Sequence, residues 1–170
     1  MATSTPSIKI RPAEPEDAAN IRDLTRAAYA KWVAVIGREP LPMQADYDRA
    51  LREHAIDLLI DGGALVGLIE TIPHSDHLWI ENVAVSPDQQ GRGFGRLLVA
   101  HVEARAAESE LYEIRLMTNA AFTANLAFYT RLGYAVVGAE PFRGGTAVTM
   151  VKRTGRGPEG QGPRARNNPV

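Results

Sequence analysis

Three glycines stand at alternate positions between an apolar segment and an amphipathic one. They are Gly91, Gly93 and Gly95, with Arg92 and Arg96 among them, in the stretch VAVSPDQQGRGFGRLL. Glycine carries an entropic cost, so this density indicates a backbone that must approach something closely. A helix that begins here leaves N–H groups unpaired in its first turn, and these groups, together with arginine side chains, favour phosphate. The pattern predicts a phosphate-binding turn, and the alternative is a tight strand-to-helix turn with solvated arginines.

Two other phosphate-binding motifs fit the sequence poorly. A dinucleotide fingerprint, G-x-G-x-x-G, requires a third glycine where Arg96 stands. A P-loop requires Lys followed by Ser or Thr, and the chain contains neither pair. The sequence therefore disfavours both the dinucleotide and the nucleoside-triphosphate interpretation.

The hydrophobic pattern predicts the elements that must position this turn. Periodicity and turn residues indicate a strand, two helices, three strands, a helix, a strand, a helix and two strands. The predicted strands span residues 8–13, 56–60, 64–72, 77–86, 111–119, 134–142 and 146–153, and the predicted helices span 15–36, 44–55, 94–106 and 120–133. This order predicts one α/β domain over residues 1–153, with a mixed sheet covered by helices on both faces. Residues 154–170, rich in glycine, proline, arginine and asparagine, are expected to form a disordered tail.

Composition limits the classes of function. The chain has 170 residues, a hydrophobic fraction of 45% and a formal net charge of −1. The charge argues against nucleic acid as the main partner, which normally demands a basic excess. The chain has no cysteine, which excludes disulfides and thiolate nucleophiles and is compatible with a reduced cytoplasm. No apolar run approaches the ~20 residues of a membrane span, so we expect a cytoplasmic protein without a membrane partner.

Two motifs together resemble the GNAT superfamily of N-acetyltransferases. The form [QR]-x-x-G-x-[GA] after a strand is met by Gln90, Gly93 and Gly95. The stretch NLAFYTRLGY resembles the family's second signature, a helix that ends in Tyr-x-x-x-Gly-aromatic. The resemblance extends from about Ile8 to Lys152 and implies a GNAT-type, mostly antiparallel sheet. It implies acetyl-CoA as co-substrate. Because homodimers are common in similar proteins, it also leads us to expect a homodimer.

The resemblance also implies which residues bind the cofactor. Main-chain groups of the strand before the turn would pair with the pantetheine arm, and the turn would hold the pyrophosphate. Asn125 would hydrogen-bond the arm, with Asn119 as the competing asparagine, and Tyr129 would point at the sulfur. The expected cofactor-binding residues are Val83, Ala84, Val85, Gln90, Gly91, Arg92, Gly93, Phe94, Gly95, Arg96, Asn119, Asn125 and Tyr129.

Acetyl transfer to an amine requires removal of a proton from the amine and donation of a proton to the leaving thiolate. Glu81 is the candidate base, because a carboxylate within an apolar strand requires an explanation. Strand alternation would place it on one face with Trp79, Val83 and Val85. Its alternative roles are binding the substrate ammonium or a structural ion pair. Tyr129 is the candidate acid, and a packed core tyrosine is its alternative.

The acceptor side is expected in the first two helices and the loop between them. Aromatic and apolar side chains there could form a wall that accepts a cation, with Arg38, Asp46 and Asp48 adding charge of both signs. Ordinary helix packing is the alternative for each residue. The expected substrate-binding residues are Tyr29, Trp32, Met43, Tyr47 and Glu81.

The loop PHSDH offers His74, Asp76 and His77, but three candidate ligands in a solvated turn do not make a convincing metal site, and we expect no metal. The sequence therefore predicts an acetyl-CoA-dependent N-acetyltransferase that modifies a primary amine of a small or amino-acid-like molecule by direct attack. The alternatives are a protein lysine or N-terminal acetyltransferase and a catalytically silent acyl-CoA-binding sensor.

Overall fold

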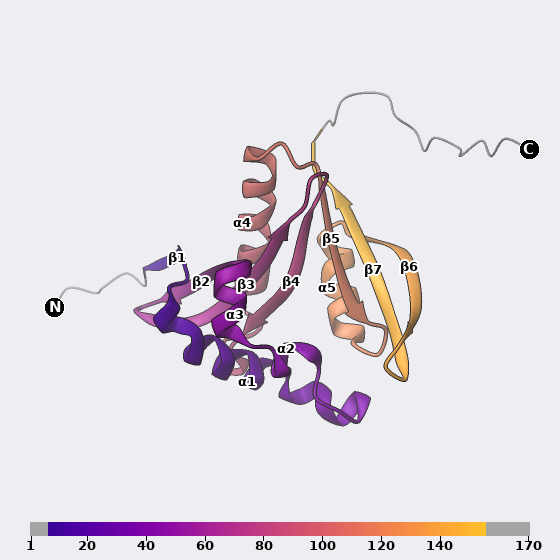
Figure 1. The fold of residues 1–170 in the computed structure, drawn as a ribbon, viewed down its shortest axis with the longest axis horizontal. Helices are drawn as coiled ribbons and strands as arrows, with labels where there is room; N and C mark the ends of the chain where they lie inside the picture. Colours follow the sequence, from indigo (N-terminus) through magenta and orange to yellow (C-terminus); the bar gives the residue numbers. More distant parts are fainter. Residues whose placement is uncertain (1–6, 156–170) are drawn as a thin grey trace, which may run out of the picture.

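The computed structural model describes residues 7–155. Seven strands form one sheet in the order β1-β2-β3-β4-β5-β7-β6 (Figure 1). The strands are β1 Ile8–Pro12, β2 Ala55–Asp61, β3 Ala64–Pro73, β4 Leu78–Val85, β5 Glu113–Asn119, β6 Ala135–Phe142 and β7 Gly145–Arg153. The α-helices are α1 Ala18–Ile36, α2 Leu41–Gln44, α3 Tyr47–Glu53, α4 Phe94–Glu108 and α5 Thr123–Arg131. The predicted mixed sheet is confirmed, because β4 and β5 are parallel while the other neighbouring strands are antiparallel.

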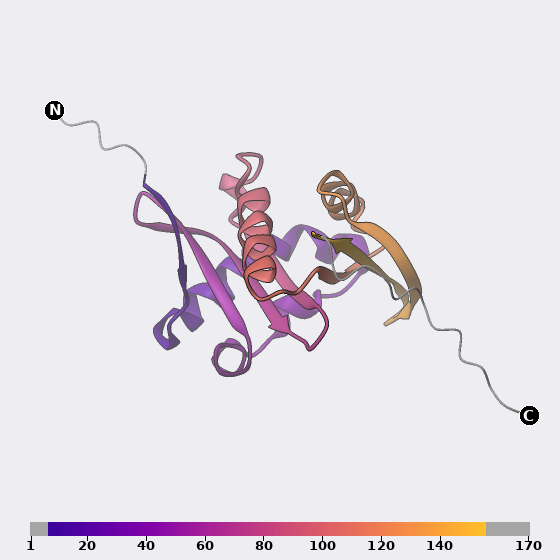
Figure 2. The same ribbon diagram turned by 90° about the horizontal axis from the view of Figure 1, so that it is seen from above.

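Helices cover both faces of the sheet, as predicted. One apolar cluster joins α4 and α5 to the middle strands, with Leu98, Val102 and Ile114 fully buried. A second cluster joins α1 and α3 to the opposite face, around Ile21 and Leu58. Figure 2 shows α4 and α5 together on one side of the sheet. Among the helices that the structure describes, none is long and apolar enough to span a membrane.

The predicted helix over residues 44–55 is replaced by two shorter ones. Pro42 lies in the first turn of α2, where a missing N–H costs nothing, so the proline-rich segment begins a helix rather than a loop. Asp46 then caps α3 by accepting a hydrogen bond from the backbone N–H of Arg49. The boundary between α2 and α3 therefore follows local capping rather than apolar periodicity. Of the predicted tail, residues 156–170 lie outside the described residues.

A bulge interrupts the alternation that was predicted for β4. Along the ladder with β3, Glu70 lies opposite Asn82 but Thr71 lies opposite Ile80, so Glu81 is an extra residue without a partner of its own. Val83 therefore packs with Ile80 on the α4 side of the sheet. The prediction that Glu81 and Val83 share one face is wrong, because the bulge reverses the alternation between them.

Candidate active site

The glycine turn lies where β4 ends and α4 begins. Gly91 and Gly93 have φ angles of 82° and 83°, in the left-handed region that other residues rarely adopt. A Cβ on either would meet nothing within 4 Å, so the turn is open on the side away from the protein. A Cβ on Gly95 would lie 3.2 Å from the Phe128 ring, so this glycine serves the close packing of α4 against α5. Two of the three glycines thus shape the turn and the third permits helix packing.

Polar groups around the turn are arranged as an anion site would require. The N–H groups that open α4 at Phe94 to Arg96 have no intrahelical acceptor, and the helix dipole adds positive potential there. Gln90 donates to the Val85 carbonyl at 3.0 Å and accepts from Lys31 at 3.1 Å. Lys31 comes from α1, so the fold brings a cation to the turn that the local sequence does not indicate.

The two arginines of the turn differ in their contacts. Arg92 lies 3.3 Å from Asp61, is held by Gln89, and stacks over the Phe94 ring at 4.8 Å. Arg96 is exposed and pairs with no carboxylate within residues 7–155. Arg96 is therefore free to contact a phosphate, whereas Arg92 would have to leave Asp61.

Strands β4 and β5 separate next to this turn. They pair only from Leu78 to Ile80, opposite Ile114 to Leu116, and diverge beyond that point (Figure 1). From Asn82 to Val85, β4 keeps its ladder with β3 on one edge and has no strand on the other. The carbonyls of Val83 and Val85 accept hydrogen bonds from the side chains of Tyr29 and Gln90. A strand edge without a neighbouring strand can accept an extended ligand as though it were a further strand.

A cavity of about 280 Å³ opens at this divergence. Its wall combines residues from α1, the α1–α3 connection, α3, β3, β4, β5, α5, β6 and β7. The sequence-predicted residues that line it are Tyr29, Tyr47, Glu81, Val83, Asn119, Asn125 and Tyr129. Trp32 and Met43 lie outside the lining: Trp32 stacks on Phe122 with ring centres 4.4 Å apart, and Met43 is the buried residue of α2. Ala84 is also buried, at 2% exposure, in the cluster beneath α1.

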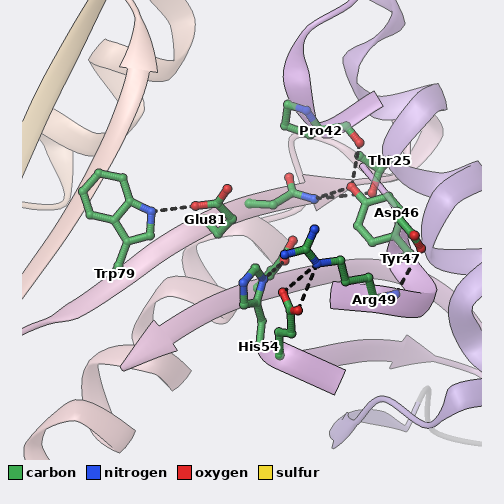
Figure 3. Close-up of polar contacts among 11 residues, drawn as sticks. Thr25, Pro42, Asp46, Tyr47, Arg49, His54, Trp79 and Glu81 are labelled. Atoms are coloured by element: carbon green, nitrogen blue, oxygen red, sulfur yellow. Dashed lines mark hydrogen bonds and ion pairs between the residues drawn. The ribbon is translucent and has the colours of Figure 1, made fainter. Parts of the chain in front are cut away.

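Glu81 is exposed at the cavity wall rather than buried within the strand. Its carboxylate accepts a hydrogen bond of 2.7 Å from the Trp79 indole N–H (Figure 3). The bulge explains this position, since a residue without a cross-strand partner can direct its side chain into the cavity. No arginine or lysine of residues 7–155 pairs with Glu81, so its charge is available to a ligand.

A second carboxylate in the cavity was missed from the sequence. Glu70 on β3 is only 3% exposed, lines the cavity, and lies 2.5 Å from Nδ1 of His54. Burial raises the pKa of Glu70, while the hydrogen bond from His54 opposes the rise. In the sequence, Glu70 follows the apolar residues of ALVGLI, so the segment resembles a core strand. Nothing in the segment indicates that Glu70 would pair with His54.

Asn82 organises the cavity wall on the α1 side. Its buried amide accepts from the Tyr29 hydroxyl at 2.9 Å and donates to the Tyr47 hydroxyl at 3.3 Å. Tyr47 in turn donates to the Pro42 carbonyl at 2.7 Å, which ties α3 to α2 (Figure 3). Burial raises the pKa of Tyr47 to about 12. These phenols therefore stay neutral and act as fixed hydrogen-bonding groups between β4 and the first helices.

The α5 side of the cavity carries Tyr129 and Asn125. Tyr129 is 8% exposed, packs edge-on against Tyr134, and makes no hydrogen bond through its hydroxyl within the described residues. Burial raises the pKa of Tyr129, so the phenol keeps its proton at neutral pH. Asn119 uses its side-chain oxygen to accept from the Ala121 N–H at 2.9 Å, whereas the Asn125 amide has no such local bond. Asn125 is thus the freer of the two asparagines.

The histidine loop between β3 and β4 forms its own local contacts. The rings of His74 and His77 stack 4.4 Å apart, and Nδ1 of His77 lies 2.6 Å from Asp76. Within residues 7–155, no group of three or more His, Cys, Asp or Glu side chains is arranged to hold a metal ion.

Comparison with known proteins yields one family match. The family described as "Acetyltransferase (GNAT) family" matches residues 19–134, which include the glycine turn, both cavity carboxylates and all of α5. A search of curated protein sequences gives no significant match.

Several solved structures share the fold at low sequence identity. A PaiA N-acetyltransferase from Thermoplasma acidophilum, in complex with coenzyme A, superposes with a TM-score of 0.75 at 19% identity, covering 86% of this chain and 99% of that one. The ribosomal-protein-S18-alanine N-acetyltransferase from Escherichia coli gives 0.70 at 20% identity, covering 91% and 99%. The yncA structure from Salmonella typhimurium, with its cofactor acetyl-CoA, gives 0.69 at 18% identity, covering 91% and 98%.

Proposed function

Because the chain belongs to the acetyltransferase (GNAT) family, we propose that it transfers an acetyl group from acetyl-CoA to a primary amine of a small, amino-acid-like molecule. One observation carries this proposal. A single cavity is lined by Tyr129 and Asn125 from α5, by the unpaired edge of β4, and by the carboxylates Glu70 and Glu81. The groups that we assign to the cofactor and to the acceptor thus line the same cavity.

The residues present fit acetyl-CoA. The open turn at Gly91 and Gly93, with the N–H groups that begin α4, would hold the pyrophosphate. The unpaired edge at Val83 and Val85 would pair with the pantetheine arm, and the Asn125 amide would hydrogen-bond it. Bound there, acetyl-CoA supplies an acyl group activated as a thioester.

Three groups of the chain would then act on the reacting atoms. A main-chain N–H of the unpaired β4 edge would stabilise negative charge on the carbonyl oxygen. Tyr129, which holds its proton at neutral pH, would donate to the departing sulfur. Glu81 would bind the ammonium group of the acceptor from the cavity wall, because its carboxylate is exposed and has no cationic partner.

The opposite charge at the cavity supports an amino-acid-like acceptor. Arg38 lines the cavity from the loop after α1, and its guanidinium contacts only the Glu39 carbonyl at 3.5 Å. No carboxylate of residues 7–155 pairs with Arg38. An acceptor with an amine at Glu81 and a carboxylate at Arg38 would satisfy both charges, since arginine binds carboxylates in a bidentate manner.

Thiol release from acetyl-CoA against a panel of amines tests the proposal. The panel should contain free amino acids, their amides, simple polyamines and short peptides with a free N-terminus, with each product identified by mass spectrometry. We expect free amino acids to be acetylated faster than their amides, because amidation removes the carboxylate that Arg38 would bind. Preferred acetylation of the peptides would favour a protein N-terminal acetyltransferase, and coenzyme A binding without any product would favour a sensor.

Replacing Glu81 with glutamine separates ammonium binding from proton removal. The amide keeps an oxygen for the Trp79 indole but loses the charge, so the acceptor KM should rise by about tenfold or more while kcat changes little. Steady-state kinetics at saturating acetyl-CoA measures both constants. Asp48, which the sequence suggested as an acceptor-side charge, is exposed on α3 and lies outside the cavity lining, so Asp48→Asn is the matched control and should leave both constants unchanged. A 10²-fold fall in kcat at constant KM would instead make Glu81 the base.

A further inference from the structure

Glu70 is a carboxylate that the reaction described so far does not use, although it lies in the cavity wall. We propose that Glu70, held by His54, takes the proton from the acceptor amine, an assignment that rests on the proposed function. The contacts of Glu70 carry the assignment: its side chain is 5% exposed, lines the cavity, and has His54 as its partner at 2.5 Å. A buried carboxylate requires such a partner, because isolated burial of the charge is costly.

Glu70 suits proton removal better than Glu81 does. A general base works best when its pKa lies near the operating pH, and burial of a carboxylate raises its pKa toward that range. Burial raises the pKa of Glu70, whereas Glu81 is exposed and bonded to the Trp79 indole. Glu81 would thus anchor the ammonium and Glu70 would deprotonate it.

The groups that face Glu70 are few and come from three elements. His54 at the end of α3 is its direct partner, and Tyr47 on α3 and Tyr29 on α1 are neutral phenols. Glu81 on β4 is the remaining charge, and its repulsion raises the pKa of Glu70 further. His54 is thus the sole cation-forming group placed against Glu70 within the described residues, and we assign it a positioning role.

His54, the partner of Glu70, lies in the wall of a second hollow on the surface. It lines a surface depression together with Leu51, Asp57, His101 and Arg105, whereas Glu70 lines the cavity. The His54 side chain is 23% exposed, so small solutes can reach its position from this side. His101 offers a matched comparison: its Nε2 lies 3.2 Å from the buried Asp57, but neither residue lines the cavity.

The proposed step balances. One proton leaves the acceptor nitrogen for a Glu70 carboxylate oxygen, and the freed lone pair forms the bond to the acetyl carbon. The carbon–sulfur bond breaks, the sulfur takes a proton from Tyr129, and the nitrogen, which began as an ammonium group, gives its second proton to water. Water in the cavity then receives the Glu70 proton and restores the Tyr129 hydroxyl, so both residues return to their starting states.

Glu70→Gln is the direct test, measured on the best amine of the panel. Because the amide cannot accept the proton, kcat should fall by about 10²-fold or more, with coenzyme A affinity unchanged. Thermal melting with and without coenzyme A checks fold and binding. Where Glu70→Gln does not fold, Glu70→Asp keeps the charge but moves it back by one carbon, and kcat should still fall more than tenfold.

His54→Ala tests the positioning role through the pH profile of kcat/KM. Loss of His54 removes the contact that holds the Glu70 carboxylate in its charged form, so the acid limb should move to higher pH by about one unit or more. Added imidazole can enter from the hollow and replace the lost ring, so it should return the low-pH side of the profile toward its wild-type position. His101→Ala should leave the profile in place and show no response to imidazole.

The outcomes separate this assignment from the proposed function. Absence of acetylated product from the wild-type protein with every amine overturns the function and the assignment with it. Turnover by the wild-type protein that persists in folded Glu70→Gln overturns the assignment alone. An acid limb that stays in place in His54→Ala, with or without imidazole, overturns the role of His54.

Discussion

Gly93→Asp should remove most of the rise in melting temperature that coenzyme A gives the wild-type protein. A ligand that binds only the folded state stabilises it by about 2.7 kcal/mol when its concentration is 100-fold above Kd. The new carboxylate would stand in the turn where the pyrophosphate is expected, and like charges 4 Å apart repel by about 1 kcal/mol each even in water. With two phosphate charges, we expect the affinity to fall by roughly 30-fold or more.

Gly93→Asn is the matched control, because it has the same shape without the charge. Asparagine tolerates the left-handed conformation that Gly93 adopts at φ 83°, and a Cβ there meets no neighbouring atom. Both variants therefore carry similar backbone strain, and their difference isolates electrostatics. Differential scanning fluorimetry during a coenzyme A titration measures the melting-temperature shift of each variant. Equal shifts in the two folded variants would contradict the proposal that the pyrophosphate binds at this turn.

The parts of the fold that could be predicted from sequence are those that local rules govern. The hairpin around Gly62 and Gly63, the end of α1 at Gly37 and the glycine turn all require residues that accept positive φ. All three fall at the limits predicted for the strands 56–60 and 64–72 and for the helices 15–36 and 94–106. The same holds for the final antiparallel pair, β6 and β7, which a two-residue turn connects. Such signals lie within a few residues of the feature they specify.

The parts that could not be predicted depend on contacts between distant segments. Glu70 and His54 are 16 positions apart and meet only because β2 and β3 pair and α3 ends beside them. The bulge at Glu81 arises from the register of β3 against β4, which neither strand's own sequence displays. Trp32, expected from the sequence on the acceptor side, lies outside the cavity lining and packs against Phe122 at the start of α5, a contact between segments 90 positions apart.

Tyr129→Phe should lower turnover by roughly 10- to 10³-fold, which corresponds to about 1.4 to 4 kcal/mol of transition-state stabilisation. The substitution keeps the ring, which packs against Tyr134, and removes only the hydroxyl at the cavity. That hydroxyl has no hydrogen-bond partner within the described residues, so its loss should cost little stability. Coenzyme A should bind the variant as it binds the wild-type protein.

Tyr134→Phe is the control for this experiment. Tyr134 is a buried phenol in the same aromatic cluster, but its hydroxyl donates to Glu103 at 3.3 Å and it does not line the cavity. Its replacement should leave turnover unchanged. If Tyr129 donates to the leaving sulfur, the loss in Tyr129→Phe should shrink for an acyl thioester whose thiol has a lower pKa, since that thiolate leaves without help. Full turnover by Tyr129→Phe, or a loss equal for every thioester, would make Tyr129 a packing residue and move proton donation to water.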